Sequence, residues 1–109
     1  MVRRALKDVR RVQVRSYSGL TVEFVRSLGA KVIVRGLRVI SDFEAEYQMA
    51  LTNRKLAPDV EMVCLMTGLD YAFMSSSIVK EIASMGGSVS QFVPAHVEEA
   101  LRARLAVSN

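Results

Sequence analysis

The sequence has little of what several classes of protein require. It contains one cysteine, one histidine and no tryptophan, and its longest uninterrupted apolar run covers only residues 62–66. Such a run is far too short to cross a bilayer, and residues 1–8 carry charges where a signal peptide has its apolar stretch. A single cysteine cannot form an internal disulfide, and Cys64 lies inside the apolar run. These features predict a soluble, cytoplasmic protein with a buried thiol.

Aromatic residues are also scarce, at 6% of the chain, and the positive charge is unevenly placed. The net charge is +4, but residues 1–15 hold six bases and one acid, whereas the remainder holds nine bases and ten acids. Proteins that bind nucleic acids usually spread bases over a folded face and add aromatic side chains for stacking. The composition therefore predicts neither a nucleic acid nor a membrane as partner.

What the chain does have is enough apolar material for a core. Half of its 109 residues are hydrophobic, and no linker, repeat or low-complexity stretch divides it. A chain of this length usually forms one domain. We therefore expect residues 1–109 to form a single domain.

Helix and strand signals alternate along the chain. Strands are expected at residues 12–17, 31–34 and 60–66, and helices at residues 2–8, 22–28, 41–56, 77–85 and 94–105. Ser41 and Glu44 have the spacing of a capping box, and Gly29 and Gly86 follow helix ends, where glycine is preferred. Strands separated by helices predict an α/β fold with a parallel sheet.

Two arginines flank a glycine directly after the expected strand 31–34. In open α/β sheets, ligands bind beyond the carboxyl ends of the strands. Arg35 and Arg38 lie at such an end, and guanidinium groups bind phosphate oxygens through paired N–H donors. Gly36 between them would let the backbone approach a ligand closely. The sequence therefore predicts a phosphate site here.

The helix expected at residues 41–56 has two stripes. One stripe consists of Asp42, Glu46, Met49 and Asn53, and the other consists of Phe43, Tyr47, Ala50 and Arg54. The second stripe is the better candidate for the core. Two interpretations of the first stripe remain open: it faces a ligand, or it is a solvated face whose acids pair with the arginines.

Three consecutive serines, Ser75, Ser76 and Ser77, precede the helix expected at residues 77–85. Free amides at the start of a helix, together with hydroxyl groups, can hold a phosphate without a metal. The alternative is that one serine caps the helix and the others fill a turn. A cap needs only one serine, which favours the anion site.

Several motifs together carry a resemblance to a known family. They are Arg35-Gly36-Leu37-Arg38, Asp42-Phe43-Glu44, Gln48-Met49-Ala50, Asn53-Arg54, Phe73-Met74-Ser75-Ser76-Ser77, Val79-Lys80-Glu81, Gly86-Gly87 and Phe92-Val93-Pro94. In this order and spacing, residues 2–105 resemble the C-terminal part of bacterial phosphopantetheine adenylyltransferases.

The resemblance implies a nucleotidyltransferase of coenzyme A biosynthesis with a partial Rossmann-like fold. Such an enzyme reversibly transfers the adenylyl group of ATP to 4′-phosphopantetheine, which gives dephospho-coenzyme A and pyrophosphate. The resemblance also implies Mg²⁺, held mainly by ATP, and a homo-oligomer, which is a hexamer in the family.

By the same resemblance, two sets of residues bind the substrates. Those expected to bind phosphopantetheine are Thr21, Arg35, Asn53 and Glu81. Those expected to bind ATP are Gly36, Leu37, Arg38, Glu46, Tyr71, Ala72, Phe73, Met74, Ser75, Ser76 and Ser77.

One family motif does not occur in the printed sequence. The family's Thr-x-Gly-His, whose threonine and histidine bind the triphosphate, is absent from these residues. No catalytic residue is therefore assigned, and the domain is expected to be truncated, without the family's first strands. Strand 12–17 would then pair with strand 31–34 or with another copy. The alternative function is an inactive fragment or module that binds adenine nucleotide or coenzyme A, or acts only in assembly.

Overall fold

The computed structural model describes residues 1–105, apart from the side chains of Ile40 and Ser41. Its elements are α1 (Val2–Ala5), α2 (Thr21–Ser27), β1 (Val32–Leu37), α3 (Ile40–Leu56), β2 (Glu61–Met66), the 3₁₀ helix η1 (Leu69–Tyr71), α4 (Ser76–Ser84) and α5 (Ala95–Leu105). They form two compact units, which are described separately: residues 16–73, and residues 1–15 together with the chain from residue 74 onward. None of the described helices is long and apolar enough to span a membrane.

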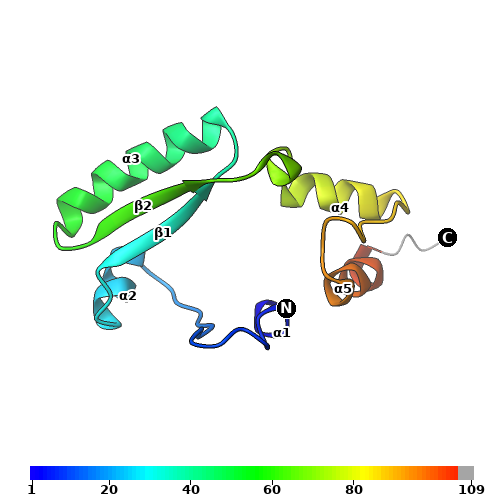
Figure 1. Ribbon diagram of the computed structural model, residues 1–109, viewed down its shortest axis with the longest axis horizontal. Coiled ribbons are helices and arrows are strands. Elements are labelled where there is room, and N and C mark those ends of the chain that lie inside the picture. Colours follow the sequence, from blue (N-terminus) through cyan, green and yellow to red (C-terminus); the bar gives the residue numbers. More distant parts are fainter. Residues whose placement is uncertain (106–109) are drawn as a thin grey trace. The chain divides into compact units, whose positions relative to one another are not determined.

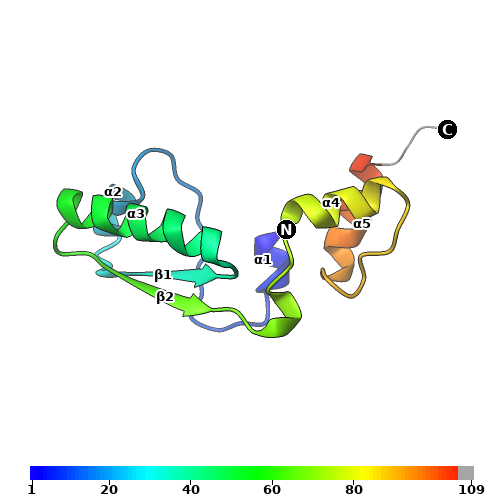
Figure 2. The same cartoon turned by 90° about the horizontal axis from the view of Figure 1, so that it is seen from above.

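The unit of residues 16–73 is built on a parallel pair of strands. β1 and β2 run side by side, from Val32 opposite Glu61 to Leu37 opposite Met66. α3 connects them and lies along one face of the sheet (Figures 1 and 2). The predicted α/β class and the parallel pairing are therefore confirmed.

A small core lies where both strands begin. Val22 of α2, Ala57 and Val60 are buried there, and Val25 and Ile33 pack against them. An ion pair between Arg26 and Asp59 joins α2 to the turn before β2. Together these contacts fix α2 against the amino ends of the strands.

The strand predicted at residues 12–17 does not form. This stretch is irregular in the structure, and β1 pairs only with β2 within the described residues. An extended segment becomes a strand only when a neighbour satisfies its backbone amides and carbonyls. The expected pairing of this segment with β1 is therefore wrong, while its pairing with another copy stays a prediction.

The prediction of a buried thiol is also wrong, and one face of β1 is exposed. Val32 and Val34 are 51% and 61% exposed, because α3 covers one face of the sheet and these side chains alternate to the other. Cys64 is exposed as well. It lies opposite Arg35 in the register, while α3 makes its contacts mainly with β1. The thiol therefore lies beside the covered strand and not beneath the helix.

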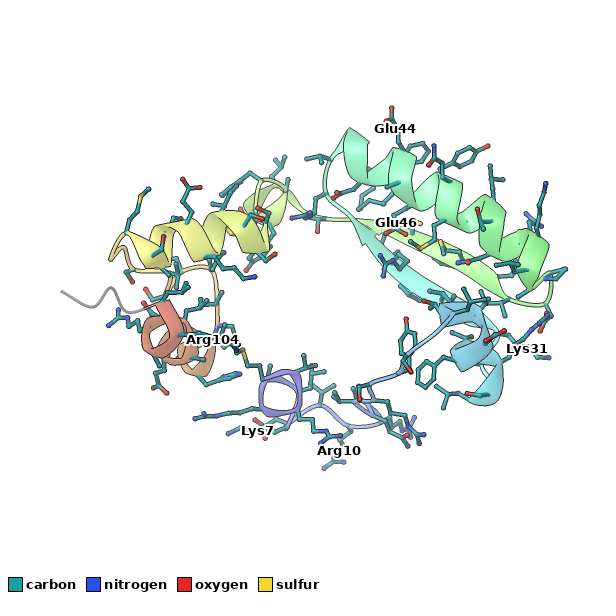
Figure 3. All side chains as sticks on the ribbon, turned by 180° about the vertical axis from the view of Figure 1, so that it is seen from behind. Lys7, Arg10, Lys31, Glu44, Glu46 and Arg104 are labelled. Atoms are coloured by element: carbon teal, nitrogen blue, oxygen red, sulfur yellow. The ribbon has the colours of Figure 1, made fainter. Side chains whose placement is uncertain are left out.

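α3 turns its charged stripe, and not its aromatic stripe, toward the sheet. Glu46 is 9% exposed, whereas Phe43 and Tyr47 are 54% and 56% exposed. Figure 3 shows Glu46 pointing toward the strands and Glu44 pointing away from them. The predicted core stripe is therefore wrong, because the acids of α3 pair with arginines at the end of β1.

The predicted capping box does not begin α3. Val39 precedes the first helical residue and makes no side-chain cap hydrogen bond. Ser41, which was expected to cap the helix, lies inside it, and its side chain is outside the described residues.

The second unit contains α4 and α5, which pack against each other. Ser75 caps α4, since its Oγ accepts a hydrogen bond from the amide of Ile78 at 3.2 Å. Val79 and Val89 are the buried apolar side chains of this unit among the described residues. Gly86 ends α4 with a φ of +81°, which confirms the predicted glycine stop.

Gly86→Ala is expected to lower the free energy of unfolding by about 1–2 kcal/mol, because a side chain in the left-handed conformation meets its own backbone. Urea unfolding would measure the change. Gly68→Ala is the matched control, since Gly68 has a φ of −67° and open space around it. Equal losses in the two variants would show that backbone conformation is not the cause.

Glu98 of α5 holds the loop between the two helices of this unit. Its carboxylate accepts hydrogen bonds from Arg102 at 2.9 Å, from the Ser88 hydroxyl at 3.2 Å and from the Val89 amide at 3.3 Å. Partial burial acts to raise the pKa of Glu98, but these hydrogen bonds outweigh it and hold the pKa below its ordinary value.

The lowered pKa of Glu98 predicts an acid-sensitive contribution to stability. This contribution is present above the ordinary pKa of 4.5 and is lost as the pH falls through the folded-state value. Glu98→Gln is therefore expected to show a smaller loss of stability than the wild type between about pH 5 and pH 3. Glu99→Gln is the control, since it removes an exposed carboxylate of the same helix. Denaturation at each pH should give this variant the same dependence of stability on pH as the wild type. Identical profiles for Glu98→Gln and the wild type would contradict the assignment.

Candidate phosphate-binding site

Arg35 lies in the second half of β1 and is held by a carboxylate of α3. Its Nη2 donates to Oε1 of Glu46 at 2.6 Å, and its Nε lies 3.1 Å from both carboxylate oxygens. The Glu46 side chain is 11% exposed and that of Arg35 is 47% exposed. The hydrogen bond to Glu46 raises the pKa of Arg35, so the guanidinium stays charged. This pair therefore presents a fixed positive group on the helix-covered face of the sheet.

Arg38 follows the last residue of β1 and pairs with the first turn of α3. Its Nε and its backbone amide both donate to Oδ2 of Asp42 at 3.1 Å. The hydrogen bond from Arg38 lowers the pKa of Asp42, which keeps this carboxylate charged. Asp42 thus closes the turn between β1 and α3.

The two pairs bear on both interpretations that the sequence left open. Asp42 and Glu46 do pair with the arginines, yet the Glu46 carboxylate is largely buried and is not part of a solvated face. An arginine has five N–H donors, and the hydrogen bonds from Arg35 to Glu46 come from Nε and Nη2. The remaining donors of Arg35 can serve an anion.

An apolar hollow of about 290 Å³ lies at the carboxyl ends of β1 and β2. It is lined by Leu37, Arg38, Val39, Phe43 and Met66. Its walls are apolar apart from the arginine, so it suits a flat or aliphatic group that carries an anion at one end.

A smaller pocket, of about 80 Å³, lies farther along α3. It is lined by Ile33, Ala50, Asn53, Arg54, Val60, Glu61 and Met62. The Nδ2 of Asn53 is buried here without an acceptor. A buried amide donor normally has a partner, so this nitrogen can receive a carbonyl oxygen from a ligand.

The other residues expected at the site have varied surroundings. Thr21 begins α2, and its hydroxyl lies 2.7 Å from that of Tyr17. Tyr71 ends η1, with Ala72 and Phe73 directly after it. The remaining ones, Met74, Ser75, Ser76, Ser77 and Glu81, belong to the other unit, where the serines begin α4.

Thus one unit brings together Arg35, Gly36, Leu37, Arg38 and Glu46 at the end of β1. The sequence did not single out Asp42 as an individual site residue. The available signal was its spacing of four from Arg38, which suits an ion pair at the start of a helix.

Comparison with known proteins identifies the family. A family model described as cytidylyltransferase-like matches residues 1–82. The chain belongs to this family. It is 56% identical over 94 residues to the phosphopantetheine adenylyltransferase of Heliobacterium modesticaldum, a match that covers 86% of this chain and 56% of the relative.

Two further relatives carry the same name. The chain is 50% identical over 107 residues to the phosphopantetheine adenylyltransferase of Dictyoglomus thermophilum, which covers 98% of the chain and 65% of the relative. It is 53% identical over 102 residues to that of a Roseiflexus species, which covers 94% and 64%. The predicted resemblance is confirmed, and the chain spans 56–65% of the length of these relatives.

Proposed function

We propose that this chain serves the transfer of the adenylyl group of ATP to 4′-phosphopantetheine, which yields dephospho-coenzyme A and pyrophosphate. The two arginine–carboxylate pairs at the end of β1 carry the proposal, because the reacting groups of both substrates are phosphates. Relatives of that name, at 50–56% identity, support the choice of substrates.

The proposed chemistry is an in-line displacement at phosphorus. Such a reaction depends on positioning and charge neutralisation more than on a protein nucleophile. Arg35 would bind the phosphate of phosphopantetheine, and Arg38, with Gly36 and Leu37, would bind ATP. Glu46 would contribute to the nucleotide site and hold Arg35.

Asn53, Thr21 and Glu81 are the further residues proposed to bind phosphopantetheine. The unpaired Nδ2 of Asn53 suits an amide carbonyl of the pantetheine arm. The hydroxyl of Thr21 already has Tyr17 as a partner, so its methyl group is the part available for the arm. Glu81 lies on the surface of α4.

Residues 71–77 are proposed to hold the nucleotide as well. Ser75 uses its hydroxyl to cap α4, while the first amides of this helix lack carbonyl partners within it and favour an anion. The remaining residues of the segment, Tyr71, Ala72, Phe73 and Met74, lead the chain into the helix.

Mg²⁺ is proposed to be held mainly by ATP, where it would neutralise phosphate charge. Within the described part of the chain, no three side chains of histidine, cysteine, aspartate or glutamate are grouped as a protein-bound metal requires. We also propose a cytoplasmic location and a homo-oligomer. The oligomer is supported by the half-exposed Val32 and Val34, which give the sheet an apolar face that another chain could cover.

A binding module without chemistry is the second candidate function. The 109 residues contain no Thr-x-Gly-His, a motif that would contribute two such groups, and in electrostatic catalysis the loss of even one stabilising donor costs about 10²–10³ in rate. We therefore expect the 109-residue protein to form dephospho-coenzyme A at least about a thousandfold more slowly than a phosphopantetheine adenylyltransferase that has the motif. Pyrophosphate release would measure this, and rates within tenfold of each other would remove the second candidate.

Equilibrium dialysis with a panel of ligands tests the substrate class. The protein is expected to bind dephospho-coenzyme A and to bind ATP more tightly than CTP. Added 4′-phosphopantetheine is expected to compete with bound dephospho-coenzyme A and displace it. Circular dichroism would show that the protein used is folded. Preference for CTP would redirect the proposal to cytidylyl transfer, and no binding of any of these ligands at millimolar concentration would reject it.

A further inference from the structure

Asp42 is placed to act on the ligand through Arg38. It lies in the first turn of α3, where its Oδ2 accepts from both the backbone amide and the Nε of Arg38 at 3.1 Å. Its side chain is 26% exposed. Arg38 in turn lines the apolar hollow at the ends of the strands. The carboxylate therefore holds the arginine at both its backbone and its side chain.

This geometry reduces the conformational freedom of a long side chain. A free arginine loses rotamer entropy when a ligand orders it. A hydrogen bond to Nε restricts the rotation of the guanidinium plane, and the hydrogen bond to the backbone amide fixes the residue from which the side chain extends. Groups that are ordered before binding cost less to immobilise when the ligand arrives.

We propose that Asp42 is a positioning residue that holds the Arg38 guanidinium at the hollow for a phosphate of the nucleotide. The proposal rests on the proposed function, because it takes an adenine nucleotide as the ligand. Asp42 itself does not contact the ligand. It acts by keeping Arg38 in the orientation that the ligand needs.

Neutralising Asp42 has opposite expected effects on ligand affinity if Asp42 positions Arg38 and if it acts only by its charge. Asp42 is an anion close to a site proposed for anions, so its direct Coulomb effect on the ligand is repulsive. If that effect dominated, neutralising Asp42 would strengthen binding. If Asp42 positions Arg38, neutralising it weakens binding instead.

The test is calorimetric titration of dephospho-coenzyme A into the wild type and Asp42→Asn. The asparagine keeps the size of the side chain but loses the charge-assisted hydrogen bond. The dissociation constant is expected to rise about tenfold in Asp42→Asn. Glu44→Gln is the matched control: it removes an exposed acid of the same helix that points away from the sheet (Figure 3), and its affinity is expected to be unchanged or slightly higher.

Dependence on Arg38 is the second readout. In an Arg38→Ala background, Asp42→Asn is expected to cause no further loss of affinity, because the group that it positions is already gone. Should Asp42→Asn fail to fold, Asp42→Glu provides the same test, since glutamate keeps the charge but places the carboxylate one methylene farther from the backbone than the hydrogen bonds to Arg38 require. It is likewise expected to weaken binding about tenfold.

The outcomes distinguish the two proposals. Wild-type binding together with unchanged or tighter binding by Asp42→Asn, or by Asp42→Glu where that variant is used, would overturn the positioning role alone. This role would also be overturned if Asp42→Asn lowered the affinity for dephospho-coenzyme A equally in the wild-type and Arg38→Ala backgrounds. Failure of the wild type to bind dephospho-coenzyme A would overturn the proposed function and the positioning role together.

Discussion

Arg35→Ala is expected to lower the free energy of unfolding by about 1–3 kcal/mol and to abolish measurable binding of 4′-phosphopantetheine. The loss of stability follows because the variant leaves the Glu46 carboxylate, whose side chain is 11% exposed, without its partner. The expected cost lies below that of a fully buried pair because the Arg35 side chain is 47% exposed. The loss of binding follows because Arg35 is the residue proposed to bind the substrate phosphate. Urea unfolding and calorimetric titration would measure the two effects separately.

A double variant tests the physical reason for this loss. Arg35→Ala combined with Glu46→Ala removes both charges and is expected to recover part of the stability but none of the binding. Arg26→Ala is a useful comparison, because it breaks the exposed ion pair with Asp59 and should destabilise the protein less. A double variant no more stable than Arg35→Ala would show that the unpaired carboxylate is not the cause.

Arg38→Ala is expected to weaken binding of dephospho-coenzyme A by about 1–3 kcal/mol, as for the loss of a charged hydrogen-bond partner. The affinity should therefore fall roughly fivefold to more than a hundredfold. Lys55→Ala is the matched control, since Lys55 is an exposed base in the last turn of α3, the helix that follows Arg38. Calorimetry on both variants would separate a direct contact from the general effect of positive charge. Equal losses in the two variants would rule out a specific role for Arg38.

The sequence predicted the elements that local signals define. Helix ends followed from Gly29 and Gly86, which have φ angles of +69° and +81°. Ser75 caps α4, which was the alternative to the favoured anion site, and that site stays a prediction. The parallel pairing of β1 and β2 followed from the helix between them. These features depend on a few neighbouring residues, so they can be recognised without knowledge of the fold.

The predictions that failed depend on what lies next to each segment. Residues 12–17 alternate like a strand but have no strand beside them in the described structure. Cys64 lies in an apolar run, yet the helix covers the neighbouring strand. The prediction of which stripe of α3 faces the sheet was wrong, because hydrophobic periodicity takes no account of ion pairs between a helix and a strand.

The candidate site was predicted in part. The position of Arg35 and Arg38 near a strand end followed from the apolar run before them, and the structure brings both to the same end of β1. Their partners could not be chosen from spacing alone, because the same stripe of acids suits a ligand or the arginines. The observed hydrogen bonds show that Glu46 and Asp42 pair with the arginines, while contact of this stripe with a ligand stays a prediction.

The central claim is that the carboxyl end of β1 binds the phosphates of an adenine nucleotide. Nuclear magnetic resonance of the ¹⁵N-labelled protein during titration with dephospho-coenzyme A tests it most directly. Within residues 16–73, the backbone amides of residues 35–38 are expected to show the largest shift changes, and Arg38→Ala should reduce them. Shift changes confined to the basic residues 1–15, with residues 35–38 unmoved at saturation, would contradict the claim.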